Sequence, residues 1–425
     1  MPAAILVASA LGLLVLGFPI FLAILASTLV TFEMFGPSMP SHVLAQRLVE
    51  GVNVFALLAV PLFIFAADII GRGQIGRRLV DLMEGLVGHH RGGLGIATVL
   101  ACAMFGAISG IGAAAVVSIG PIVYPSMIRS GYGRGFTVGL ILAASTLAMM
   151  IPPGVAMILY SIQNSTSVAR VFLAGLSSGI LFIAMISAWC WFHAWRQNII
   201  PNDRVPAKEM VKRFYRSLWA VGLPIIIFGG IYGGIFTPTE AAAAACVYAA
   251  FVEVVIYRQI KPWQLLKISQ PSAIMIATLL ILISVGSLMT WFLTLERVPA
   301  QVATLMSVVP PGAVLAMINV LFLLTGMFID PNSAIIVMAP LIQPTAMAIG
   351  LDSVHLGAIL VFNLAIGMIT PPFGLNIFIG ISTFQLPYVT VVKSVVPFIV
   401  IGLITLLLIT YIPILTTWLP VQVYG

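Results

Sequence analysis

Asp330 is an acidic residue in an otherwise apolar stretch, residues 326–332, that reads Gly-Met-Phe-Ile-Asp-Pro-Asn. A carboxylate in such a segment is costly to bury and indicates a functional site. A hard cation such as sodium would be bound by its oxygens together with the Thr325 hydroxyl and nearby backbone carbonyls. A structural role is the alternative, and compatible with it, because an Asp directly before a Pro is a favoured arrangement at the start of a helix; we favour the cation role.

Two Pro-Pro pairs, Pro152-Pro153 and Pro371-Pro372, predict interruptions in two apolar helices. Proline lacks a backbone donor and clashes with the preceding turn, so two in succession break a helix. Carbonyl groups released at such a break can replace water around a small cation, and the helix that starts after it can face an anion. Simple packing kinks are the alternative, since Pro and Gly often bend helices of this kind.

These two Pro-Pro pairs belong to an internal repeat with an offset of 219 residues. At this offset five proline and glycine positions align one to one without a gap. The first copy has Pro121, Pro125, Gly131, Pro152 and Pro153, and the second has, in the same order, Pro340, Pro344, Gly350, Pro371 and Pro372. Each copy has a tip upstream of its Pro-Pro pair, at residues 106–112 and 326–332. In the first tip Ser109 is the neutral counterpart of Asp330, or it simply caps a hairpin.

Composition predicts an all-α protein that crosses a membrane several times. Hydrophobic residues make up 61% of the 425 residues and charged residues 7%, whereas soluble proteins carry about 25% charged residues. Runs such as 1–31, 171–194 and 395–418 reach the roughly 20 residues that a spanning helix needs. The net charge of +7 lies in short connections between these runs, as the positive-inside rule expects, and does not indicate nucleic acid. The sequence contains no nucleophile–base set that would indicate an enzyme. It also contains no phosphate-binding glycine loop that would indicate an ATP-driven motor.

The basic clusters at residues 72–91, 129–134, 196–216 and 258–267 mark one side of the membrane, which we assign as cytoplasmic. The segment between Arg91 and Arg129 begins and ends on that side, so it either crosses twice or forms a re-entrant hairpin. The chain then crosses the membrane an odd number of times between the two repeats. This predicts that the repeats enter the membrane from opposite faces. Such an inverted repeat is typical of secondary transporters.

Four further features have structural interpretations. The run 1–31 is either one long helix or a helix broken at residues 17–19, and residues 80–91 are typical of an interfacial amphipathic helix. Glu240 lies in the first turn of a predicted helix, and this position favours a structural role as a cap of the helix N-terminus. Asp68, near the cytoplasmic end of a span, is expected to pair with an arginine.

The ordered motifs resemble the large membrane subunit of tripartite ATP-independent periplasmic (TRAP) transporters, the DctM-like family. The matching residues extend over essentially the whole chain: 106–110, 151–160, 236–243, 326–331, 355–357 and 363–374. The first tip departs from the family pattern Ser-Gly-Ser-x-Ala, since residues 109–113 read Ser-Gly-Ile-Gly-Ala and lack the second hydroxyl.

The resemblance implies an inverted-repeat, elevator-type transporter in the bacterial inner membrane, with two re-entrant helical hairpins and two discontinuous helices. It implies sodium-coupled import of an organic acid such as a sialic acid or a C4-dicarboxylate, with no bound cofactor besides the coupling ion. Implied partners are a small four-helix membrane subunit and a periplasmic substrate-binding protein. The corresponding division of the chain is a scaffold segment at 1–91, a transport repeat at 92–170, central scaffold spans at 171–310, a second transport repeat at 311–390 and a C-terminal helix at 391–425.

The resemblance also implies where ligands bind. One sodium ion would lie around Ser109, Gly110 and Pro152. Another would lie around Thr325, Gly326, Asp330, Gly367, Met368 and Thr370. Substrate would lie between the tips, near Gly112, Asn332 and Thr370.

Two other classes of function stay open. A stand-alone sodium/anion symporter of the divalent-anion or citrate type shares inverted hairpins and needs no binding protein. A membrane scaffold or enzyme without transport activity is the third class. The Thr-Pro-Thr-Glu-Ala stretch at residues 237–241 and the Asp-Pro pair at 330–331 favour the TRAP subunit.

Overall fold

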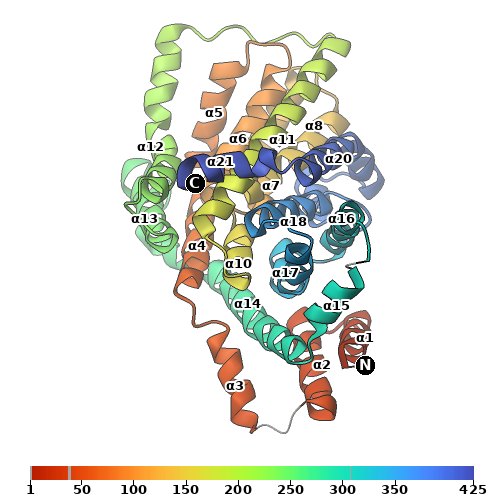
Figure 1. Ribbon diagram of the computed structural model, residues 1–425. Coiled ribbons are helices and arrows are strands. Elements are labelled where there is room, and N and C mark those ends of the chain that lie inside the picture. Colours follow the sequence, from red (N-terminus) through yellow and green to blue (C-terminus); the bar gives the residue numbers. More distant parts are fainter. Residues whose placement is uncertain (1, 37–39, 307) are drawn as a thin grey trace.

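The computed structural model describes residues 2–36, 40–306 and 308–425, and all regular elements in these ranges are helices (Figure 1). Within this part of the chain nine helices are long and apolar enough to cross a membrane. The prediction of an all-α, multi-pass membrane protein is therefore confirmed.

The N-terminal run is broken, as one of the two alternatives predicted. Helix α1 (Pro2–Val15) and helix α2 (Ile20–Phe35) pack against each other. Between them Gly17 has a φ of 86°, a left-handed conformation that glycine adopts without steric cost, and Pro19 precedes the new helix. Residue 1 lies outside the described residues.

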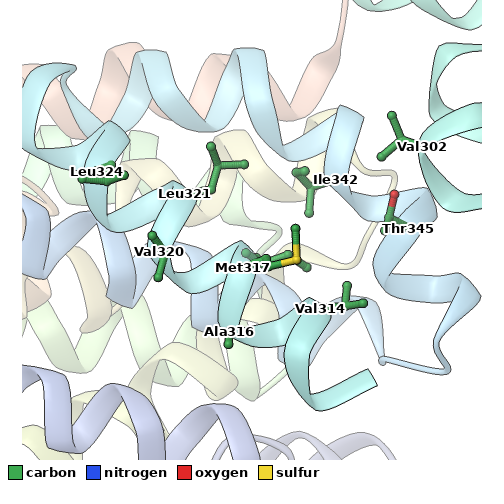
Figure 2. A pocket seen from close by; sticks show the side chains of 10 residues that line it. Val302, Val314, Ala316, Met317, Val320, Leu321, Leu324, Ile342 and Thr345 are labelled. Carbon is green, nitrogen blue, oxygen red and sulfur yellow. The ribbon is translucent and has the colours of Figure 1, made fainter. Parts of the chain in front are cut away.

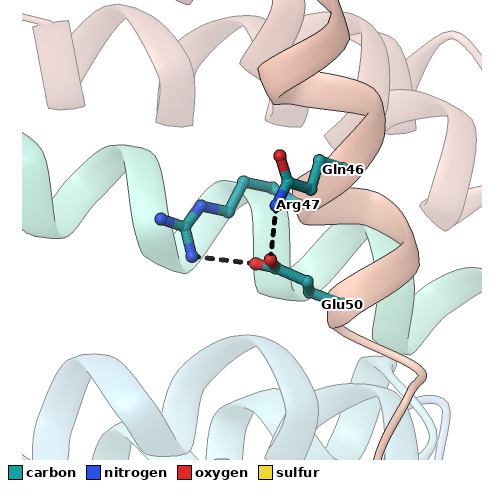
Figure 3. A network of polar contacts seen from close by, with 3 residues as sticks. All are labelled: Gln46, Arg47 and Glu50. Atoms are coloured by element: carbon teal, nitrogen blue, oxygen red, sulfur yellow. Dashed lines mark hydrogen bonds and ion pairs between the residues drawn. The ribbon is translucent and has the colours of Figure 1, made fainter.

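Helix α3 (Ser41–Glu50) is anchored to the long helix α14 (Pro262–Leu295), which crosses the lower half of Figure 1. The Arg47 guanidinium lies 5.2 Å from the centre of the Trp291 ring. Figure 3 shows Arg47 and Gln46 both donating to the Glu50 carboxylate, at 3.0 and 2.9 Å. The contact of Arg47 with Trp291 joins α3 to α14, whereas the bonds to Glu50 lie within α3.

The framework consists of helices that neither repeat contains. They are η1 (Phe55–Leu58), α4 (Ala59–Arg72), α5 (Ile75–Val87), α11 (Val168–Arg196), α12 (Ala207–Tyr232), α13 (Pro238–Phe251) with η2 (Val252–Ile256), α14 and α15 (Val298–Met306). Glu240 forms a reciprocal capping box with Thr237 at the start of α13, so its predicted structural role is confirmed.

Two framework contacts differ from the sequence-based expectations. Asp68 accepts a hydrogen bond from the Ser272 hydroxyl, which joins α4 to α14, rather than pairing with an arginine. A serine on a distant span gives no sequence signal for this contact. The apolar face of α5, which includes Leu79 and Val80, is buried against α6 and α12 instead of being free for lipid.

Each repeat contains a helical hairpin and a discontinuous helix. The first repeat consists of α6 (Gly93–Ser109), α7 (Gly112–Arg129), α8 (Arg134–Ser145), α9 (Leu147–Met150) and α10 (Val155–Gln163). The second consists of α16 (Pro311–Phe328), α17 (Pro331–Ala348), α18 (Ser353–Gly367) and α19 (Leu375–Phe384), followed by α20 (Tyr388–Tyr411) and α21 (Ile414–Tyr424). Helix breaks at Pro152-Pro153 and Pro371-Pro372, both cis, match the predicted interruptions.

The two repeats pack into each other reciprocally. Helix α7 of the first hairpin contacts α19 of the second repeat, and α17 of the second hairpin contacts α10 of the first. Five spans lie between the start of α8, at the basic Arg134, and the start of α16, so the hairpins enter from opposite ends. The inverted arrangement thus places both tips near the middle of the molecule. The division into scaffold and transport segments stays a prediction.

A prediction concerns the close packing of α8 on α20. An added Cβ at Gly139 would lie 2.0 Å from the Ser394 carbonyl oxygen, so Gly139→Ala forces α20 away. Overpacking of this kind costs about 1–3 kcal/mol, and we expect a lower melting temperature of the purified chain in detergent. Gly229→Ala, in the interior of α12 with nothing within 4 Å, is the matched control and should not lower it. Equal melting temperatures for the two variants would contradict the packing described here.

Candidate functional site

The first hairpin tip lies directly on the first helix break. Helix α6 ends at Ser109 because Gly110 adopts a φ of 62°. A Cβ at Gly110 would lie 2.2 Å from the Pro153 carbonyl oxygen, and the Gly110 carbonyl accepts from the Val155 amide at 3.4 Å. The predicted neighbours Ser109, Gly110 and the Pro152 break are therefore brought together. The Ser109 hydroxyl is fully buried and has no hydrogen-bond partner within the described structure.

The second tip has a different backbone. Helix α16 ends at Phe328 and Ile329 is extended, with a φ of −120°, where the first tip has a left-handed glycine. Asp330 then caps α17, accepting from the amides of Asn332 at 3.0 Å and Ser333 at 3.2 Å and from the Ser333 hydroxyl. The capping role is thus present. Its half-buried carboxylate still borders the space between the tips.

The hydroxyl groups predicted to join Asp330 donate elsewhere. Thr325 donates to the Leu321 carbonyl at 2.8 Å, and Thr370 donates to the Ile366 carbonyl at 2.7 Å. Both bonds lie within the residue's own helix or its last turn. The hydroxyl oxygens can still accept or coordinate, but their protons are already placed.

Gly326 and Gly367 form a helix contact. A Cβ at Gly367 would lie 2.6 Å from the Gly326 Cα, so only glycine permits this approach of α16 to α18. Small residues allow such close packing of membrane helices. These two predicted ion-binding residues therefore hold the second tip against the second broken helix, and ion binding at either stays a prediction.

The two tips enclose a cavity of about 160 Å³. Its lining comes from both repeats and from α14: Gly110, Ile111, Gly112, Ala113, Met149, Met275, Asp330, Pro331, Asn332, Met368 and Leu375. Of the three predicted substrate residues, Gly112 and Asn332 line it, whereas the buried Thr370 does not. No lysine or arginine belongs to this described lining.

Three helices start at the cavity wall, with Gly112 of α7, Pro331 of α17 and Leu375 of α19. Helix N-termini carry a partial positive charge and free amide groups that favour an anion. Helix α7 has no side-chain cap, so its first amide groups are available to a ligand. At the start of α19 the amides of Asn376 and Ile377 already donate to the carbonyls of Met368 and Gly374, at 3.0 and 2.8 Å. The cavity can therefore bind a carboxylate without a cationic side chain.

Sequence reasoning missed Asn376 as a site residue. Its amide donates to the Ser145 hydroxyl at 2.9 Å, across the point where the two broken helices meet, and its carbonyl oxygen is buried without a partner. Asn363 also leaves a buried carbonyl oxygen unpartnered, while its amide donates to Asn319 at 2.7 Å. Asparagines inside apolar helices were the available signal, because polar groups in such segments require partners.

A larger cavity, of about 580 Å³, lies away from the tips between α15, α16 and α17 (Figure 2). Apolar side chains such as Met317 and Ile342 surround it, and Thr345 supplies its polar group. A charged solute would lose its hydration there without compensation. The larger volume therefore does not make it the solute site.

Comparison with known proteins agrees with this geometry. The family described as the DctM component of the tripartite ATP-independent periplasmic transporters matches residues 7–415. The chain belongs to this family. A DctM-family chain with nine candidate spans among its described residues is a transporter permease of the bacterial inner membrane.

Two relatives illustrate the range of this DctM family. The ectoine/5-hydroxyectoine TRAP transporter large permease protein UehC of Ruegeria pomeroyi is 39% identical over 390 residues, 91% of each chain. The C4-dicarboxylate TRAP transporter large permease protein DctM of Pseudomonas aeruginosa is 36% identical over 392 residues, 92% of each chain. The crystal structure of the Alcanivorax borkumensis YdaH transporter shares the fold, with a TM-score of 0.65 and 13% identity over 94% of this chain and 98% of that one.

A prediction follows from the contact of the first tip with the first break. Gly110→Ala introduces both an unfavourable positive φ and a clash with the Pro153 carbonyl, so we expect a loss of most solute uptake. Gly131→Ala is the matched control, since Gly131 has a φ of 89° but nothing within 4 Å. It carries the same kind of backbone cost, about 1–2 kcal/mol, without the clash. If both variants lose uptake equally, the contact between the first tip and the first break is not required for solute uptake.

Proposed function

We propose that this chain is the translocating subunit of a sodium-driven importer of a compact organic acid. In this proposal a periplasmic binding protein delivers the solute and a small membrane subunit completes the complex, as the word tripartite in the family description suggests. The observation that carries the proposal is the cavity where both hairpin tips meet beside both helix breaks.

Unpartnered oxygen atoms support sodium as the coupling ion. A buried polar atom without a partner costs about 1–3 kcal/mol, and the Ser109 hydroxyl is such an atom beside the Pro152 break. Hard cations are bound by hydroxyl, carbonyl and carboxylate oxygens. We assign a first ion to Ser109, Gly110 and the break, and a second to Asp330 with the chain around Met368 and Thr370.

The charge of the cavity supports a solute with a single carboxylate. The uncapped start of α7 offers partial positive charge to one carboxylate, and no lysine or arginine among the described lining residues is present to bind a second one. A zwitterion such as ectoine carries a single carboxylate, and its cationic part can face Asp330. A C4-dicarboxylate would depend on bound sodium for its second charge, and a sialic acid is bulkier than this cavity.

An elevator movement is consistent with the origin of the lining. Every lining residue except Met275 of α14 comes from one of the two repeats. We propose that the repeats move together past α14 and carry the cavity across. The reciprocal contacts of α7 with α19 and of α17 with α10 would keep this block rigid during the movement.

A charge substitution tests the role of Asp330. Asparagine caps helices as well as aspartate does, so Asp330→Asn keeps the cap and removes the charge. We expect the sodium concentration for half-maximal uptake in proteoliposomes to rise about tenfold, from the loss of one charged ligand.

The control is Asp352→Asn, because Asp352 caps α18 through the amides of Val354 and His355, both at 2.9 Å, and does not line the cavity. It should leave the sodium dependence unchanged. An unaltered sodium dependence in the Asp330 variant would remove that residue from the ion site.

Dependence on partners tests the proposal against a stand-alone symporter. We reconstitute the chain with and without its small membrane subunit and binding protein, with ectoine and a C4-dicarboxylate as separate solutes. Uptake should require both partners and an inward sodium gradient. Sodium-driven uptake by the chain alone would decide for the stand-alone symporter.

A further inference from the structure

A second polar cavity, of about 470 Å³, lies on the basic side of the molecule between α5 and α12. Four arginines and two acidic residues dominate its wall: Arg77, Arg78, Arg213, Arg216, Asp81 and Glu209. Four positive charges against two negative ones leave a net charge of +2 in a space of ligand size. The solute site between the tips does not share these residues.

None of the four guanidinium groups forms an ion pair within 4 Å among the described residues, although Arg78 interacts electrostatically with Glu253 and Arg213 with Glu84. Among the described residues the ion pairs within 4 Å are Arg47 with Glu50 and Lys212 with Glu209. Glu209 therefore pairs with a lysine that does not line the cavity, and Asp81 forms no ion pair in this part of the structure. Clustered like charges are unfavourable unless an opposite charge joins them.

Backbone carbonyls hold two of these arginines in place. Arg78 donates to the Arg216 carbonyl at 3.2 Å and to Gln74 at 3.1 Å, while Arg213 donates to the Asp81 carbonyl at 3.1 Å. The Arg78 Nε atom is buried and unpartnered. Its guanidinium also lies 4.2 Å from the centre of the Tyr257 ring. The donors are thus fixed before any anion arrives.

We propose that this cavity binds the phosphate group of an anionic phospholipid. Guanidinium groups suit phosphate because two parallel N–H donors match two phosphate oxygens. Basic pockets between helices on the cytoplasmic side are suited to anionic head groups. The ligand belongs to the chemical class of phosphate esters with a net negative charge, such as phosphatidylglycerol.

The surroundings favour a lipid over free phosphate. On α12, next to the cavity residues Arg216 and Ser217, Tyr215 is 67% exposed and Trp219 is 41% exposed. Tyrosine and tryptophan gather at the level of lipid head groups. Leu218, also exposed, continues an apolar surface on which acyl chains can lie. A free phosphate ion would use none of these side chains.

Occupation of the cavity would join two framework helices, one of which packs against the first hairpin. Helix α5 packs against α6 of the hairpin, and α12 packs against both α5 and α13. A phosphate bound by arginines of α5 and α12 bridges these two helices. A bound anionic lipid is therefore expected to raise the thermal stability of the chain.

The test compares two pairs of substitutions that remove the same charge. Arg77→Gln with Arg216→Gln empties the cavity of two guanidinium groups whose side chains donate no hydrogen bond in the described structure. Arg196→Gln with Arg204→Gln removes two basic-side arginines that do not line it. The full chain is purified in detergent, and native mass spectrometry and melting temperature are recorded with phosphatidylglycerol, phosphatidylcholine or inorganic phosphate.

We expect phosphatidylglycerol to bind and stabilise the unaltered chain and the control pair, and phosphatidylcholine to do neither. The Arg77/Arg216 pair should bind phosphatidylglycerol about tenfold more weakly, from the loss of charge-assisted contacts. Equal weakening by both pairs would overturn the proposal, since bulk charge would then explain binding. Stabilisation by inorganic phosphate without any by phosphatidylglycerol would overturn the assignment to a lipid. Transport enters none of these measurements, so they stand apart from the solute proposal.

Discussion

Backbone hydrogen bonding inside a membrane is the constraint on which the rest of this structure depends. Lipid supplies no donors or acceptors, so a broken helix is tolerated only where protein or a cavity surrounds it. Here the span Arg134–Gln163, which contains the first break, is wholly buried in its most apolar window, against 33–56% for the other spans. The chain therefore surrounds the first break with its other helices, whereas Pro372 and Phe373 at the second break are exposed.

The inverted repeat places these two breaks opposite each other. Because each hairpin packs its second helix on the broken helix of the other repeat, both tips end at one small cavity. Three helix starts and one carboxylate, Asp330, then supply the polar groups. In the proposed mechanism two sodium ions together with the Asp330 carboxylate would leave one positive charge, which a carboxylate of the solute would balance, and this coupling of ion and anion is the physical basis of the proposed symport.

Much of this arrangement could be predicted from the sequence, because prolines and glycines act locally. The Pro-Pro pairs at residues 152–153 and 371–372 break helices where the sequence places them, and Gly131 and Gly350 take similar positive φ values, 89° and 81°, in the two repeats. Contacts between distant helices had no such signal. The Gly326–Gly367 approach, the bond from Asn376 to Ser145 and the Asp68–Ser272 contact each depend on how separate spans pack. Gly326, predicted as an ion-site residue, therefore also makes a helix contact that the sequence did not indicate.

The most direct test of the account is protection of the space between the tips by ligand. The substitution Asn332→Cys places a thiol at the cavity, and Asn198→Cys places one on the exposed α11–α12 loop as a control, both with Cys246 replaced by serine. The rate of maleimide labelling is measured in sodium, in potassium, and in sodium with solute. The account predicts that sodium slows labelling at position 332, that solute slows it further, and that position 198 is unaffected. Equal labelling rates at position 332 in all three conditions would contradict it.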